Sequence, residues 1–161
     1  LIGRVVSDAG VKTGDRILML GEVVEGSIGE RVYRAKTKFK TYLELLEKEV
    51  VVNASKDCSR GGWFGNLLEM LVKSRRGVTV SSIPHPDISR YMGTYLVSVP
   101  KKEVPRVVEI AAQHRCPVVE VGVARREHTI NIGGETVVSR EEMTKLIRGM
   151  PYKKPRVRKT S

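Results

Sequence analysis

The sequence contains few of the residues that would tie a protein to a membrane, a zinc ion or a disulfide framework. Only two of its 161 residues are cysteines and three are histidines, with no CxxC pair and no histidine at zinc-ligand spacing. No apolar run approaches the roughly 20 residues that a membrane-spanning helix needs, and the first residues do not resemble a signal peptide. We therefore expect a cytoplasmic protein whose Cys58 and Cys116 are reduced, with a disulfide between them as the alternative.

Aromatic residues are also scarce, at 5%, whereas positive charge is abundant, with a net charge of +11. Residues 151–161 contain no acidic residue but five basic ones, namely Lys153, Lys154, Arg156, Arg158 and Lys159. Two prolines in this segment disfavour a helix. We expect residues 149–161 to form a basic flexible tail that is solvated, with contact to RNA or to an acidic partner as the alternative. The shortage of aromatic residues argues against recognition of single strands by stacking.

The pattern of apolar residues predicts four helices and seven strands in a mixed order. Apolar spacings of three and four mark helices, and short apolar or alternating runs mark strands. Helices are expected at 30–49, 62–77, 104–115 and 139–148, and strands at 16–20, 49–54, 78–83, 95–99, 118–123, 128–132 and 136–138. Gly133-Gly134 is a hairpin signal. This order predicts an α+β fold, with a mixed β-sheet and helices mainly on one face.

A polar, glycine-containing turn between the strand at 49–54 and the next helix is the most informative segment. Its candidate phosphate- and nucleotide-binding residues are Asp57, Ser59, Arg60, Gly61 and Gly62. The start of a helix presents unpaired amides and a partial positive charge, and glycines let an anion approach that backbone closely. The turn therefore predicts a phosphate site, although its spacing is neither that of a Walker loop nor that of a Rossmann fingerprint.

Asp57 needs a separate role, because a carboxylate repels phosphate. It would either hold a metal ion that bridges to phosphate, or cap the helix and anchor the turn. The neighbouring Cys58 is expected to have a lowered thiol pKa if it lies at the helix amino terminus. No histidine is close to it in the sequence, so we assign no catalytic residue.

The segment 54–62, followed by Leu67-Leu68-Glu69-Met70, resembles the carboxy-terminal signature of the aminoimidazole ribonucleotide (AIR) synthetase superfamily. This group includes formylglycinamidine ribonucleotide synthetase, the hydrogenase-maturation dehydratase, selenophosphate synthetase and thiamine-monophosphate kinase. Segments 91–100 and 116–122 are similar to the family's later strands. The Asp-Cys-Ser-x-Gly-Gly form of the turn is most similar to that of the formylglycinamidine enzyme.

The resemblance implies an AIR-synthase-like C-terminal domain over residues 11–148. Residues 1–10 would then be the end of, or the linker from, an N-terminal ATP-binding domain that binds most of the ATP and Mg²⁺. The complete protein would be a homodimer. Its chemistry would be activation of a carbonyl-type oxygen by phosphate from ATP, or phosphoryl transfer, as in a ligase of purine biosynthesis. The chain alone is expected to be inactive.

Two alternatives remain beside this interpretation. The first is a hydrogenase-maturation or selenophosphate-synthetase-like protein of the same superfamily, although the cysteine-terminated tail of the maturation enzyme is absent. The second is a non-catalytic domain that binds RNA or protein through its tail and the pairs Arg75-Arg76 and Arg125-Arg126. Trp63-Phe64-Gly65 also departs from the small and aliphatic residues that often follow the glycines, and Trp63 is expected to pack internally or between domains.

Overall fold

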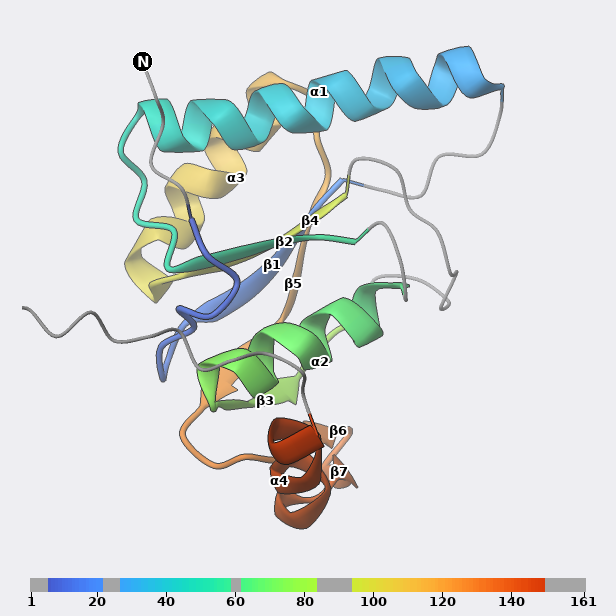
Figure 1. The fold of residues 1–161 in the computed structure, drawn as a ribbon. Helices are drawn as coiled ribbons and strands as arrows, with labels where there is room; N and C mark the ends of the chain where they lie inside the picture. The colour runs from blue at the N-terminus through green and yellow to red at the C-terminus, as the bar shows by residue number, and fades with distance from the viewer. Residues whose placement is uncertain (1–5, 22–26, 59–61, 84–93, 150–161) are drawn as a thin grey trace, which may run out of the picture.

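A seven-stranded mixed sheet forms the centre of the molecule (Figure 1). The structure is a computed structural model that describes residues 6–21, 27–58, 62–83 and 94–149. The strands are β1 (Arg16–Leu20), β2 (Ala54–Asp57), β3 (Gly77–Val80), β4 (Tyr95–Val99), β5 (Val118–Arg125), β6 (Ile130–Ile132) and β7 (Glu135–Val138). Their order in the sheet is β2-β4-β1-β5-β3-β6-β7. The β3–β6 pair is parallel and the other neighbouring pairs are antiparallel.

Helices cover both faces of this sheet. They are α1 (Ile28–Glu47), α2 (Gly62–Ser74), α3 (Val104–Gln113) and α4 (Arg140–Gly149), with a short 3₁₀ turn, η1, at Lys101–Glu103. Side chains alternate across a strand, so Ile17 and Met19 of β1 join the core under α2 and α4, whereas Leu18 and Leu20 join the core under α1 and α3. The α+β fold with a mixed sheet is confirmed, but the expectation that the helices lie mainly on one face is wrong.

The order of elements along the chain is the one that the apolar pattern predicts. One strand, however, is displaced from the apolar run at 49–54 to Ala54–Asp57. Val50 and Val52 are buried in the core under α1 and α3 without being part of a strand. The backbone amide of Val51 donates instead to a carboxylate oxygen of Glu103, at 3.2 Å. Burial therefore explains the apolar run, and the polar residues after it form the ladder with β4.

The last hairpin and helix follow their local signals closely. Gly133 and Gly134 have φ values of 58° and 82°, the conformation that a two-residue turn between β-strands requires. The Ser139 hydroxyl then accepts a hydrogen bond from the Glu142 amide at 3.2 Å, which caps the start of α4. The predicted tail at 149–161 lies outside the described residues, apart from Gly149.

The two cysteines lie on opposite faces of the sheet. Both are buried and neither is in a disulfide. Cys58 belongs to the core under α2, and Cys116 belongs to the core under α1 and α3. The intervening sheet separates the thiols, so the disulfide alternative is excluded. Within the described residues, no helix has the length and apolar character to cross a membrane.

Candidate phosphate-binding site

The strand-to-helix connection predicted as the site is present, but Asp57, which the sequence pattern places in the turn, is the last residue of the strand. Strand β2 ends at Asp57, whose partner in the sheet is Tyr95 of β4. The Cys58 amide then donates to the Thr94 carbonyl at 3.0 Å, and α2 begins at Gly62. Asp57 is exposed to solvent. Ser59, Arg60 and Gly61 lie outside the described residues, so their role in binding phosphate stays a prediction.

Gly62 has a conformation that requires glycine at the first residue of α2. Its φ is +67°, in the left-handed region that side chains with a Cβ disfavour. Gly62 is also buried, and its carbonyl accepts a hydrogen bond from the Asn66 side chain at 2.7 Å. The backbone conformation alone thus explains why the second residue of the glycine pair is a glycine, independently of any ligand.

Hydrophobic packing holds the first turns of α2 against the sheet. Trp63 is 4% exposed, and its ring meets that of Phe64 edge-on at a centroid distance of 5.6 Å. Farther along, Leu67, Met70 and Leu71 are fully buried in the same core. Trp63 is therefore a packing residue, and the amino terminus of α2 is fixed relative to the end of β2.

A four-residue ionic network joins α2, β2 and the segment before β1. Lys73 contacts Asp8 at 2.7 Å and Glu69 at 3.1 Å, and Lys56 contacts the same two carboxylates at 3.4 and 3.1 Å. Burial lowers the pKa of Lys73, but hydrogen bonds to Asp8 and Glu69 outweigh it and raise that pKa above its usual range. Lys56 directly precedes Asp57, so this network anchors the strand end that presents the carboxylate.

Two tyrosines support the same strand end from the α1 side. Tyr42 of α1 stacks on Tyr95 at 5.2 Å, and its hydroxyl lies 2.8 Å from that of Ser55. Burial raises the pKa of Tyr95, and the negative charge of Asp57 raises it further. Tyr95 is therefore a neutral phenol at physiological pH.

The thiol of Cys58 is less acidic than the sequence suggests. Burial raises its pKa to about 12, and the neighbouring Asp57 carboxylate contributes to the same shift. The expectation of a lowered pKa is wrong because the side chain is fully buried in the core under α2, where a thiolate would lose its hydration. Cys58 is therefore a core residue.

The described residues do not form a metal site on their own. Among them, no group of three or more histidine, cysteine, aspartate or glutamate side chains is arranged to hold an ion. Asp57 would thus be one ligand at most, and a Mg²⁺ ion beside it would need oxygen atoms from phosphate, water or another domain.

Comparison with known families identifies the class of this domain. The family described as AIR synthase related protein, C-terminal domain, matches residues 12–134. The chain belongs to this family. The AIR synthase related domain is 48% identical over 149 residues to the protein MJ0799 of Methanocaldococcus jannaschii, an alignment that covers 92% of this chain and 50% of that protein. It thus spans about half the length of this relative.

Two solved structures have a similar fold. PurL of Thermotoga maritima, solved in complex with ATP, superposes with a TM-score of 0.72 at 19% identity, over 86% of this chain and 27% of that one. The hydrogenase maturation protein HypE, also in complex with ATP, has a TM-score of 0.58 at 13% identity, over 83% of this chain and 52% of that one. At these identities the likeness concerns the fold.

Proposed function

We propose that this chain is the C-terminal domain of an ATP-dependent enzyme. Such an enzyme would use phosphate from ATP to activate a carbonyl-type oxygen, or would transfer a phosphoryl group. The observation that carries the proposal is the β2–α2 connection, where an exposed carboxylate, Asp57, ends the strand and α2 begins five residues later at Gly62, a glycine with a left-handed φ. In a member of the AIR synthase related family, this connection is the best candidate for the phosphate-facing side of a nucleotide or substrate site.

Each part of the connection would have a distinct role. The first amides of α2 would donate to phosphate oxygens, and the partial positive charge of the helix start would favour the anion. Ser59 and Arg60 would add a hydroxyl donor and a mobile positive charge. Asp57 would be one ligand of a Mg²⁺ ion, which when bound neutralises charge on phosphate oxygens. The ionic network and the stacked tyrosines would keep Asp57 in position.

The substrate of such an enzyme can be proposed by its chemical class. The turn motif resembles that of formylglycinamidine ribonucleotide synthetase, and PurL of Thermotoga maritima has been solved in complex with FGAR. We propose a substrate of this kind, with a carbonyl-type oxygen and a phosphate group. A hydrogenase-maturation or selenophosphate-synthetase-like reaction is the alternative, which the likeness to HypE supports.

Replacement of Asp57 tests the site in the intact protein that includes the N-terminal half. We expect Asp57→Asn to weaken Mg²⁺-dependent ATP turnover by about tenfold or more, because the amide loses the negative charge that attracts the ion. Gly61→Val should weaken ATP or substrate-phosphate binding. Turnover is measured as ADP release and affinity by calorimetry.

The matched control removes an exposed carboxylate that lies outside the β2–α2 connection. Glu109→Gln should leave both readouts unchanged, since Glu109 is exposed on α3 and is not part of that connection. If Asp57→Asn and Gly61→Val bind and turn over ATP like the parent, the site assignment is wrong. Robust ATP hydrolysis by the isolated chain would contradict the role proposed for the N-terminal half.

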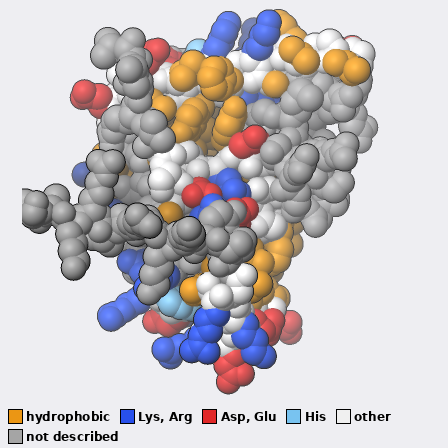
Figure 2. All heavy atoms as spheres, viewed as in Figure 1, with side chains coloured by type: hydrophobic (Ala, Val, Ile, Leu, Met, Phe, Trp, Pro, Cys, Tyr) orange, Lys and Arg blue, Asp and Glu red, His pale blue; other side chains and the backbone are white. Residues whose placement is uncertain are grey.

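We further propose that the outer side of α1 packs against that N-terminal domain. Ile28, Val32, Phe39 and Leu43 are 70%, 40%, 49% and 39% exposed, and their spacing places them on one side of the helix. Hydrophobic side chains are visible along the top of the molecule, where α1 lies (Figure 2). An apolar stripe of this kind favours a protein partner, and the relative MJ0799 has about as much chain again as this domain. The complete protein is proposed to be a homodimer.

A further inference from the structure

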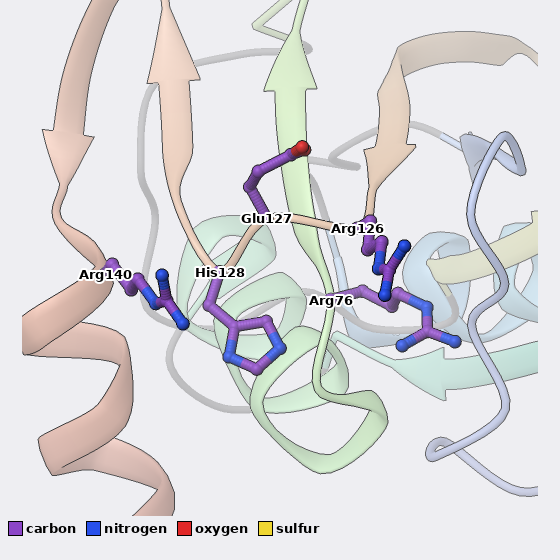
Figure 3. A pocket seen from close by; sticks show the side chains of 5 residues that line it. All are labelled: Arg76, Arg126, Glu127, His128 and Arg140. Atoms are coloured by element: carbon purple, nitrogen blue, oxygen red, sulfur yellow. The ribbon is translucent and has the colours of Figure 1, made fainter.

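A positively charged pocket lies far from the β2–α2 connection, beside the start of α4 (Figure 3). It has a volume of about 450 Å³ and is lined by Arg76, Arg126, Glu127, His128 and Arg140. Arg76 follows the end of α2, whereas the proposed phosphate site is at the start of the same helix. Because α2 has 13 residues, its two ends are about 20 Å apart. The pocket is therefore separate from that site.

Strand register brings the lining residues together from three distant parts of the sequence. The antiparallel pairing of β3 with β5 sets Gly77 opposite Arg125, so Arg76 and Arg126 leave the sheet side by side. The amide of Val78 donates to the Thr129 carbonyl at 3.0 Å, which holds the β5–β6 connection and its His128 against β3. Arg140 is the first residue of α4, and Met143 of that helix is fully buried.

Close packing beneath the pocket restricts movement of this connection. A Cβ atom at Gly77 would overlap the backbone carbonyl oxygens of both Glu127 and Thr129. Glycine at this position thus allows β3 and the β5–β6 connection to approach closely. The arginines are consequently presented by a fixed backbone.

The single acidic residue of the pocket is engaged elsewhere. Glu127 forms an ion pair with Arg125 at 3.5 Å, and its carboxylate points to the opposite side from the Arg76 guanidinium and the His128 ring (Figure 3). A hydrogen bond from its own backbone lowers the pKa of Glu127, and attraction to Arg125 and Arg126 lowers it further. Glu127 is thus ionised, and it is one carboxylate among three lining arginines.

Three guanidinium groups therefore share a pocket without an equal number of carboxylates. Within the described residues, no hydrogen bond or ion pair engages the side chains of Arg126, His128 or Arg140. Arg76 donates from Nη1 to the Arg75 carbonyl at 3.1 Å, while its buried Nε has no partner in the described part of the chain. Gathering like charges and leaving a buried donor unpaired both cost free energy. An anion with several oxygen atoms would offset both costs.

We propose that this pocket binds phosphate groups of a ligand, independently of the β2–α2 site. Guanidinium groups match phosphate oxygens in pairs, and a pocket of this volume has the size of a small-ligand site. The phosphates would come either from a small phosphorylated molecule or from an RNA backbone. On α4, Lys145 and Arg148 line a second hollow with Arg140, together with Glu141. Lysine and arginine side chains lie at this lower end of the molecule, with acidic side chains among them (Figure 2).

The pocket also depends on a part of the chain outside the family match. That match ends at residue 134, and Arg140 lies on α4, beyond it. The site would therefore be an addition to the shared domain rather than part of its common chemistry. Loss of this binding and loss of ATP turnover can accordingly be separated by experiment.

The test measures binding of two phosphate-bearing probes to the full 161-residue chain. Sodium pyrophosphate is titrated by calorimetry, and a fluorescent 12-nucleotide uridine RNA by anisotropy at several salt concentrations. We expect Arg126→Gln with Arg140→Gln to weaken binding of the preferred probe by about tenfold or more. Both positions are at the surface, so the thermal unfolding midpoint should stay close to that of the parent chain.

A charge-matched control separates the pocket from net charge. Lys101→Gln with Arg115→Gln also removes two exposed positive charges, and it should change affinity less than about twofold. Tight pyrophosphate binding with weak RNA binding would identify a small ligand. If RNA binds more tightly than pyrophosphate, if its affinity falls as salt is added, and if pyrophosphate displaces it, the ligand is an RNA backbone. The proposal is overturned if the parent chain binds neither probe, or if both double variants lose affinity equally.

Discussion

At the residue scale, burial decides the chemistry of the side chains near the β2–α2 connection. Asp57 and Cys58 are adjacent in the sequence, yet the carboxylate is exposed and the thiol is buried. This alternation is the ordinary consequence of strand geometry. It directs the carboxylate toward solvent and the thiol into the core under α2.

The first prediction concerns the reactivity of Cys58. In a Cys116→Ala chain, we expect the remaining thiol to react with a disulfide reagent at pH 8 far more slowly than a solvent-exposed cysteine, because a pKa of about 12 leaves almost no thiolate. The rate is measured from the absorbance of the thiol that the reagent releases when it reacts. Unfolding in guanidinium should restore the ordinary rate, and a fast reaction in the native protein would contradict the buried position.

Stability should also depend on this thiol at alkaline pH. The folded-state pKa is raised from 9.0 to about 12, so the unfolded chain loses the proton first as the pH rises. The contribution of the neutral, buried thiol is complete below pH 9 and is lost progressively between pH 9 and about 12.

At the scale of elements, the ionic network is one of the contacts that join β2 and α2 to the segment before β1. Lys73 and Lys56 each contact both Asp8 and Glu69, and all four side chains are mostly shielded from solvent, at 17–26% exposed. Shielded pairs of this kind are harder to replace than surface pairs, because removal of one partner leaves the other charges without compensation.

The second prediction is that Lys73→Met destabilises the domain by about 1–3 kcal/mol. Asp8 and Glu69 would then share only Lys56, and their mutual repulsion would loosen β2 from α2. Urea unfolding followed by circular dichroism measures the change. Lys145→Met, which removes an exposed lysine of α4, is the control and should change stability by less than about 0.5 kcal/mol. Equal effects of the two substitutions would show that the network contributes little.

At the scale of the whole molecule, the surface has two regions that an isolated domain does not need. The apolar stripe is on α1, at one end of the molecule, and α4 is at the other end (Figure 1). The arginine pocket lies where α2 has ended and α4 starts. The stripe favours a protein partner, whereas the pocket favours an anion. The proposed phosphate-binding connection between β2 and α2 lies between them, so each surface can be altered without changing the site itself.

The third prediction tests the α1 stripe in the intact protein with its N-terminal half. Val32→Asp with Phe39→Asp should uncouple the two halves, because two carboxylates would be buried without partners at the contact. We expect one cooperative thermal transition to become two and the linker to become more sensitive to protease. Val108→Asp, at a 47% exposed position on α3, is the control.

Two outcomes would contradict this assignment. If both halves still unfold together in the double variant, α1 does not carry the domain contact. If the halves stay coupled but light scattering shows that a dimer dissociates, a second copy of the chain occupies the stripe instead.

Much of the fold could be predicted because its signals are local. Helical spacing, glycine pairs and capping residues act within a few positions, so the order of elements and the Gly133-Gly134 hairpin follow from the sequence. Which residues pair in the sheet depends on contacts between segments that are distant in the sequence. Val50 and Val52 read as a strand because they are apolar, but contacts with α1 and α3 explain their burial, and β2 begins later.

The candidate sites also have features that the local sequence predicts and features that depend on distant contacts. The sequence alone determined that a polar turn with Asp57 and Gly62 joins a strand to a helix, because these residues are contiguous in the chain. Gly62 has a left-handed φ, a conformation that glycine adopts without strain. Only the tertiary structure decided the high pKa of Cys58, the four-residue ionic network and the joining of Arg76 with Arg126, His128 and Arg140. These depend on burial and on the β3–β5 register, which bring together residues that are distant in the chain and that no local spacing relates.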